Sequence, residues 1–140
     1  MKTIAVKTTV EVSWNTVGNI LVNAFEGGSN YWYMIHDKKR PKNFKNSEKG
    51  DDRYSHMSYP INEGGAILVS NEKLSGGKDC EDGEDEHKEA WVNQESLTKG
   101  LEIMADKYPS HFNDMVSEND DASTGDVLLQ CTLFGEVIYG

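Results

Sequence analysis

Residues 17–33 read VGNILVNAFEGGSNYWY, and this stretch determines more of the fold than any other part of the chain. Its apolar side chains recur at the spacing of one helical face: Val17, Ile20, Leu21, Ala24 and Phe25. Burying such a stripe contributes roughly 7–15 kcal/mol gross, at ~1.5–3 kcal/mol per large side chain. We therefore predict an amphipathic helix that packs on the core.

Both ends of this helix carry boundary signals. Ser13 or Asn15 can cap the first turn, because their side-chain oxygens accept from free backbone N–H groups. Gly27 and Gly28 are expected to end the helix, since glycine adopts the left-handed conformation found there. The aromatic run that follows, residues 31–35, has the composition of a strand.

Further strands are expected on both sides of this region. Residues 4–12 alternate partly and are rich in Val, Thr and Ile, which predicts an N-terminal strand. Residues 54–61 and 66–70 flank Asn-Glu-Gly-Gly and predict a hairpin. Residues 90–92 predict a short strand.

The last third is expected to be mostly helical. Leu97, Leu101, Met104 and Tyr108 repeat every three or four residues, with Asn93 or Ser96 as a cap. Pro109 either breaks this helix or opens the next one, whose apolar side would be Phe112, Met115 and Val116. Residues 121–124 resemble a helix start and Gly135 a stop, although a strand over 127–134 is the alternative.

The order of elements predicts an α+β fold: a small antiparallel sheet with helices packed on one face. A length of 140 residues fits a single domain over residues 1–140. Charged loops, expected to be mobile, fall near residues 37–53 and 74–88. The two cysteines lie far apart in unlike settings, and the N-terminus has no apolar signal segment. We therefore expect a reducing, cytoplasmic compartment without membrane insertion.

The net charge of −10 argues against binding of nucleic-acid backbone, which requires clustered lysine and arginine. The charge is unevenly distributed. Seven of the 14 basic residues fall within 38–53, whereas seven acidic residues fall within 79–89. A run of this kind is usually a solvated loop, but it could also imitate nucleic-acid phosphates for a basic host protein.

Motifs with a known catalytic mechanism are missing from the sequence. It contains no phosphate-binding Gly-x-x-x-x-Gly-Lys-Ser/Thr loop, no Gly-x-Gly-x-x-Gly, no His-Glu-x-x-His and no Cys-x-x-Cys. The four histidines have no nucleophile at an informative spacing. We expect no resident metal or cofactor, and we favour a binding protein over an enzyme.

The segment around Trp32 is the candidate ligand site. Short polar groups and three consecutive aromatic rings can form a pocket, since rings stack on bases and small polar groups fix orientation. The simpler interpretation is a tight turn leading into a core strand. The candidate ligand-binding residues are Ser29, Asn30, Tyr31, Trp32, Tyr33, Arg53 and His111.

Several short segments carry a combined signature: residues 24–33, 99–101, 104–112, 125–130, 133–136 and 139–140. Together they resemble a group of small accessory proteins encoded by tailed bacteriophages. The resemblance covers both ends of the chain and leaves residues 37–89 unmatched. It implies a phage protein acting in the cytoplasm of an infected bacterium, and it transfers no catalytic or binding residue, because no activity is established for the group.

Three functions follow, in order of preference. The first is evasion of host defence by sequestering a nucleotide-derived signalling molecule, with the aromatic segment stacking on bases and Arg53 pairing with phosphate. Such a protein would be a symmetric homo-oligomer. The second is an acidic inhibitor that imitates DNA and binds a host defence protein. The third is an enzyme that degrades a nucleotide.

Overall fold

A computed structural model describes residues 2–28, 32–42, 55–74, 78–79, 88–119 and 121–140. Along the chain, the described elements are α1 (Trp14–Asn23), a π-helix (Ala24–Gly28), β1 (Met34–Lys39), a 3-10 helix (Ser55–Ile61), β2 (Ala66–Asn71), β3 (Lys78–Asp79), β4 (Lys88–Val92), α2 (Gln94–Lys107), α3 (Pro109–Val116) and α4 (Ala122–Phe134).

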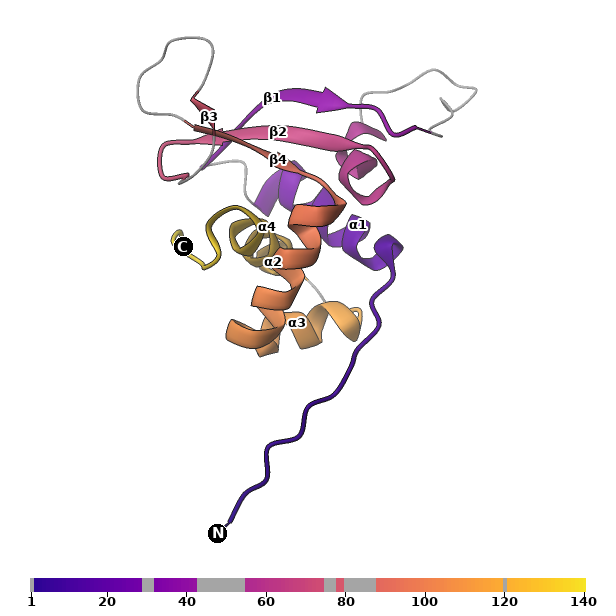
Figure 1. The fold of residues 1–140 in the computed structure, drawn as a ribbon, viewed down its shortest axis with the longest axis vertical. Coiled ribbons are helices and arrows are strands. Elements are labelled where there is room, and N and C mark those ends of the chain that lie inside the picture. The colour runs from indigo at the N-terminus through magenta and orange to yellow at the C-terminus, as the bar shows by residue number, and fades with distance from the viewer. Residues whose placement is uncertain (1, 29–31, 43–54, 75–77, 80–87, 120) are drawn as a thin grey trace.

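The strands form one antiparallel sheet in the order β1-β2-β4-β3. The four α-helices lie together on one side of this sheet, so the molecule has two layers (Figure 1). The core lies between the layers, where Ile67 and Val69 of β2 meet Ile20 and Leu21 of α1 and Leu128 of α4. The predicted α+β fold with helices on one sheet face is confirmed.

The helix predicted from residues 17–33 is present as α1, with the N-cap at Ser13, whose Oγ accepts from the backbone N–H of Thr16 at 3.2 Å. Val17, Ile20 and Leu21 are buried, as the stripe indicated. The helix continues as a π-helix and ends at Gly28.

The C-terminal helices also follow their sequence signals. α2 begins with a capping box in which Asn93 and Ser96 exchange side-chain-to-backbone hydrogen bonds. Pro109 opens α3 at its first turn. α4 begins at the capping box of Asp121 and Thr124 and ends at Gly135, which has φ 76°. The alternative of a strand over residues 127–134 is therefore wrong.

Three strand predictions need correction. Residues 2–13 form no regular element, because no described strand lies beside them to pair with their backbone. Residues 55–61 form a 3-10 helix that contains Pro60, so the hairpin with β2 is absent. The strand expected over 31–35 instead spans Met34–Lys39, which also places residues 37–39 in the sheet rather than in a loop. Residues 43–54 and 80–87 lie outside the described part of the chain.

α4 is the central helix, and glycine lets its neighbours approach closely. A Cβ added at Gly125 would lie 2.2 Å from the carbonyl oxygen of Ile20 and 3.1 Å from Cβ of Ala24. Ile20 lies in α1, and Ala24 is the first residue of the π-helix that follows it. A Cβ added at Gly100 of α2 would lie 2.2 Å from Oγ1 of Thr132. α1 and α2 therefore contact α4 at distances that only glycine permits.

Candidate functional site

A hollow of about 320 Å³ opens where β1 begins and β2 ends, beside the C-terminal segment. We call it the aromatic pocket; its lining residues are Trp32, Tyr33, Met34, Ser70, Asn71, Glu72 and Tyr139. The volume lies at the lower end of the ~300–1,000 Å³ found for small-molecule sites. Two of the lining residues belong to the aromatic segment that the sequence singled out.

Aromatic rings form the inner wall of the aromatic pocket. The rings of Trp32 and Tyr139 are stacked, with centroids 5.5 Å apart and planes inclined by 15°. Tyr33 meets Trp32 edge to face at 5.2 Å, and Phe134 packs on Trp32 at 5.3 Å. Trp32 is 7% exposed, so it is mainly a core residue with one edge at the pocket.

Polar groups hold Trp32 in place from two sides. Its indole Nε1 donates to Oδ1 of Asp126 in α4 at 2.8 Å. Its carbonyl oxygen accepts from Nδ2 of Asn71 at 2.6 Å, and the same amide nitrogen donates to the Tyr139 hydroxyl at 3.1 Å. The polar groups of Trp32 and Asn71 are therefore used within the protein, and they set the shape of the aromatic pocket.

Gln130 fixes the C-terminal segment against α4. Its Oε1 accepts from the backbone N–H groups of Ile138 and Tyr139, each at 2.8 Å. Its Nε2 donates to Oδ2 of Asp126 at 2.9 Å and to the carbonyl oxygen of Tyr139 at 3.2 Å. A fully buried amide with four hydrogen bonds is satisfied, so Gln130 positions the Tyr139 ring without an unpaired polar atom.

Two charged side chains, Glu72 and Lys73, remain for a ligand at the mouth of the aromatic pocket. Glu72 and Lys73 are exposed, and the Lys73 ammonium lies 5.1 Å from the centroid of the Tyr139 ring. Burial, and secondarily the charge of Asp126, raises the pKa of the Tyr33 hydroxyl well above its usual value of 10.0. The Tyr33 hydroxyl donates to the carbonyl oxygen of Phe25 at 3.4 Å, so its proton is used within the protein.

A histidine and a serine lie next to this pocket, but their arrangement does not favour nucleophilic catalysis. Nε2 of His36 lies 2.6 Å from Oγ of Ser70. His36 occupies the irregularity in β1 between Ile35 and Asp37, where a bulge redirects the side chain. Ser70 is 1% exposed, so its hydroxyl cannot reach a substrate carbonyl from this position.

The structure places only part of the sequence-predicted site. Trp32 and Tyr33 both line the aromatic pocket. His111 lies on α3 and does not line this pocket; its Nδ1 is buried and has no hydrogen-bond partner among the described residues. Ser29, Asn30, Tyr31 and Arg53 lie outside the described residues, as does the acidic run over 80–87.

Sequence reasoning missed Asp126, Gln130 and Tyr139. A usable signal existed, because Asp126 and Gln130 are polar residues spaced i, i+4 within an otherwise apolar helical run. Such a pair on a buried helix face indicates side chains that bond to each other and to a third group. Asn71, at the end of a buried strand, carries a similar signal.

The described residues hold no group of three or more His, Cys, Asp or Glu side chains placed to bind a metal ion. None of their helices has both the length and the apolar content needed to span a bilayer.

The described residues thus form a small α+β fold with an aromatic pocket where β1 begins and β2 ends. No protein-family model, curated protein or solved structure matches the chain significantly.

Proposed function

We propose that this protein is a non-enzymatic phage accessory protein that sequesters a nucleotide-derived signalling molecule of the host defence, in the cytoplasm of the infected bacterium. The observation that carries the proposal is the aromatic pocket itself. It joins stacked aromatic rings within about 320 Å³, and the exposed Lys73 lies beside it, over the Tyr139 ring. Rings of this kind stack on nucleobases, and an ammonium pairs with phosphate.

The charges at the pocket mouth give the ligand an orientation. The base is expected to pack on the aromatic side of the pocket, which Trp32, Tyr33 and Tyr139 line. The Lys73 ammonium, above the Tyr139 ring, is placed for a phosphate. The Glu72 carboxylate repels phosphate and accepts hydrogen bonds, so it suits a ribose hydroxyl or an exocyclic amino group.

A thermal-shift screen against cyclic dinucleotides and ADP-ribose derivatives tests the proposal. A ligand at a hundred times its Kd stabilises the folded state by ~2.7 kcal/mol, which raises the Tm by several degrees. Chromatography of the recovered ligand separates capture from degradation: unchanged ligand supports sequestration, whereas a cleaved product supports the enzyme. A flat screen would overturn both.

Two matched lysine variants locate the site. Lys73→Gln should weaken binding of a phosphorylated ligand roughly tenfold, the effect expected when one charge-assisted hydrogen bond is lost. Lys99→Gln removes the same charge from an exposed position on α2, where the side chain is 72% exposed, and should leave the Kd unchanged. Equal effects of the two variants would place the ligand elsewhere.

The acidic inhibitor remains the second candidate, on the evidence of the net charge of −10 and the acidic run over 79–89. Its binding to a basic defence protein would weaken steeply with salt. Replacing the acidic residues over 79–86 with neutral ones should abolish inhibition of the host target. Undiminished inhibition by that variant would reject this candidate.

A further inference from the structure

Residues 2–12, here called the tail, are extended (Figure 1); residues 2–11 are exposed, and Val12 is partly buried against the core. Ile4, Val6 and Val10 are 86%, 72% and 51% exposed, although β-branched apolar residues usually pack against other groups. Within the described residues, no hydrogen bond joins the tail backbone to another segment. Figure 1 shows the tail leaving the start of α1 and running past α3, away from the body.

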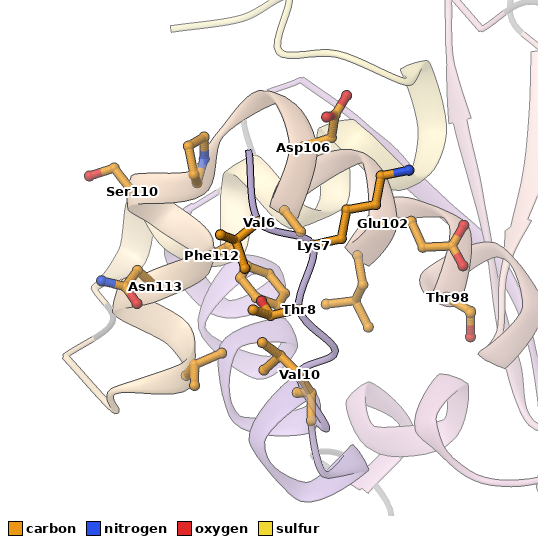
Figure 2. Close-up of a pocket in the computed structure, with 15 residues that line it drawn as sticks. Val6, Lys7, Thr8, Val10, Thr98, Glu102, Asp106, Ser110, Phe112 and Asn113 are labelled. Atoms are coloured by element: carbon orange, nitrogen blue, oxygen red, sulfur yellow. The ribbon is translucent and has the colours of Figure 1, made fainter. Parts of the chain in front are cut away.

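A second, larger hollow lies between the tail and the helices α2 and α3. This tail groove measures about 1080 Å³. Its helical side carries apolar groups, namely Leu101, Ala105, Pro109, Phe112 and Val116. Four of the five tail residues that line it are even-numbered: Val6, Thr8, Val10 and Val12. One face of the extended tail thus faces an apolar helical surface that it does not fill (Figure 2).

Charges at the tail groove identify the chemistry of what can fill it. Glu102 and Asp106 of α2 line the groove together with Lys7 of the tail, so its helical rim is acidic. Figure 2 shows Lys7 extending toward the side of the groove that carries these two carboxylates. An occupant should therefore be extended, apolar on one face and net basic. A second tail has an apolar face of Ile4, Val6 and Val10, and it carries two basic residues, Lys2 and Lys7, against one acidic residue, Glu11.

We propose that the tails of two copies of this chain pair as antiparallel strands over the two tail grooves, forming a two-fold symmetric dimer. Pairing gives each tail backbone the hydrogen-bond partners that it lacks in one copy. A two-stranded ribbon alone is marginal in water, and the apolar surfaces of α2 and α3 supply the packing that it needs.

The alternation selects a register centred on Thr8. In an antiparallel pair, even residues share a face only when they stand opposite even residues. Centring on Thr8 places Val6 opposite Val10 and Ile4 opposite Val12, so apolar residues meet on both sides of the central Thr8 pair. The same register places Thr9 of the second chain directly opposite Lys7, whose diagonal neighbours are then Lys7 and Glu11 of the second chain.

The edge strand β1 is a less suitable partner for the tail. Met34 and Ile35 are exposed on it, but the strand continues with Lys38 and Lys39. Lysines on an edge strand oppose the addition of another strand, and they would repel the basic residues of the tail. The tail groove has the opposite charge, which favours it as the docking surface.

Molar mass by light scattering is the first test, on the full-length chain at its highest soluble concentration. The wild type should have the mass of a dimer. The variant Val6→Asp/Val10→Asp should be monomeric with an unchanged far-UV circular dichroism spectrum, because neither side chain belongs to the core. The matched control Thr3→Asp/Thr9→Asp alters the other face and should remain dimeric. A monomeric wild type, or a dimeric Val6→Asp/Val10→Asp variant, would overturn the proposal.

Cysteine crosslinking tests the register. In a background with Cys80→Ser, Thr8→Cys should form a disulfide-linked dimer on mild oxidation, since directly opposed Cα atoms lie ~4.5–5.5 Å apart, within disulfide range. Thr3→Cys has no opposed copy in this register and should stay monomeric on a non-reducing gel. A dimer by mass whose Thr8→Cys variant does not crosslink would place the tail elsewhere and overturn the pairing. Because none of these readouts involves a nucleotide, their outcome is independent of the proposed ligand.

Discussion

The indole Nε1 of Trp32 donates to Oδ1 of Asp126 at 2.8 Å, and this bond ties the start of the sheet to the central helix α4. The other carboxyl oxygen accepts from Nε2 of Gln130 at 2.9 Å. Asp126 thus accepts from two side-chain donors, one on each carboxyl oxygen. The bond between Trp32 and Asp126 helps to set the shape of the aromatic pocket.

Asp126→Ala should lower the free energy of unfolding by about 2–4 kcal/mol, because it leaves two buried donors without that acceptor. Equilibrium urea unfolding, followed by tryptophan fluorescence, measures the change. Glu102→Ala, an exposed acidic residue on α2, serves as the control and should change stability by less than about 0.5 kcal/mol. Similar midpoints for both variants would show that the Trp32–Asp126 bond carries little energy.

Gln130→Glu should destabilise the protein at neutral pH by roughly 3 kcal/mol, because a second carboxyl group then faces Oδ2 of Asp126 in a buried setting. Burial and like charge raise the pKa of the introduced group above its unfolded value. Its protonated form is therefore the stable one in the fold, and stability should recover as the pH is lowered toward 5. Gln130→Met provides the comparison, since its deficit should not vary with pH in this way.

Gly125→Ala should destabilise the fold by about 1–3 kcal/mol, the range for overpacking. Helix propensity alone predicts the opposite sign, since alanine is favoured over glycine by ~1 kcal/mol within a helix. The sign of the change in Tm therefore reports whether the close approach of α4 to the Ile20 carbonyl oxygen exists. Lys99→Ala, at an exposed helical position, should leave the Tm almost unchanged. A stabilised Gly125→Ala variant would contradict this packing.

The cap of α4 should give acid sensitivity. A hydrogen bond from the Ser123 hydroxyl, followed by those from the backbone N–H groups of Thr124 and Ser123, lowers the pKa of Asp121 below its ordinary 3.8. The stabilising contribution is therefore complete above pH 3.8 and is lost as the pH falls through the lower folded value. Asp121→Asn keeps a capping oxygen that does not titrate. Thermal melts from pH 5 to pH 2 should show a smaller loss of Tm for this variant than for the wild type.

Cys131 should be unreactive in the folded protein. Burial raises the pKa of its thiol to about 11, an effect that Lys107 opposes only in part. In a Cys80→Ser background, a thiol reagent at pH 8 should react much faster after urea is added than before. Rapid labelling of the native protein would show that α4 opens more readily than its burial indicates.

The sequence predicted the helices well because their signals are local. α1 shows a regular apolar stripe and a serine cap, and the caps of α2 and α4 lie within three residues of their helices. α4 was harder, because residues 127–131 are buried on every side, and a helix buried all round has no amphipathic period. Its boundary signals at Asp121 and Gly135 favoured a helix over a strand, and the structure has a helix there.

The strand predictions were weaker because a strand depends on a partner that may lie anywhere in the chain. Residues 4–12 have strand composition, but none of the described strands pairs with them. In the aromatic segment, composition identified Trp32 and Tyr33 as noteworthy but did not show that Trp32 is mainly a core residue. That role depends on Asn71 and Asp126, which lie 39 and 94 positions away.

The closed set of bonds among Trp32, Asn71, Asp126, Gln130 and Tyr139 has a kinetic consequence. Its members come from both ends of the chain, so the set cannot form until a loop of most of the sequence has closed. During synthesis, α1 can become helical early, but the hydrogen bond of Trp32 to Asp126 can form only after α4 has left the ribosome. Indole fluorescence from the Trp32 environment should therefore report a late step of folding, after the local helices have formed.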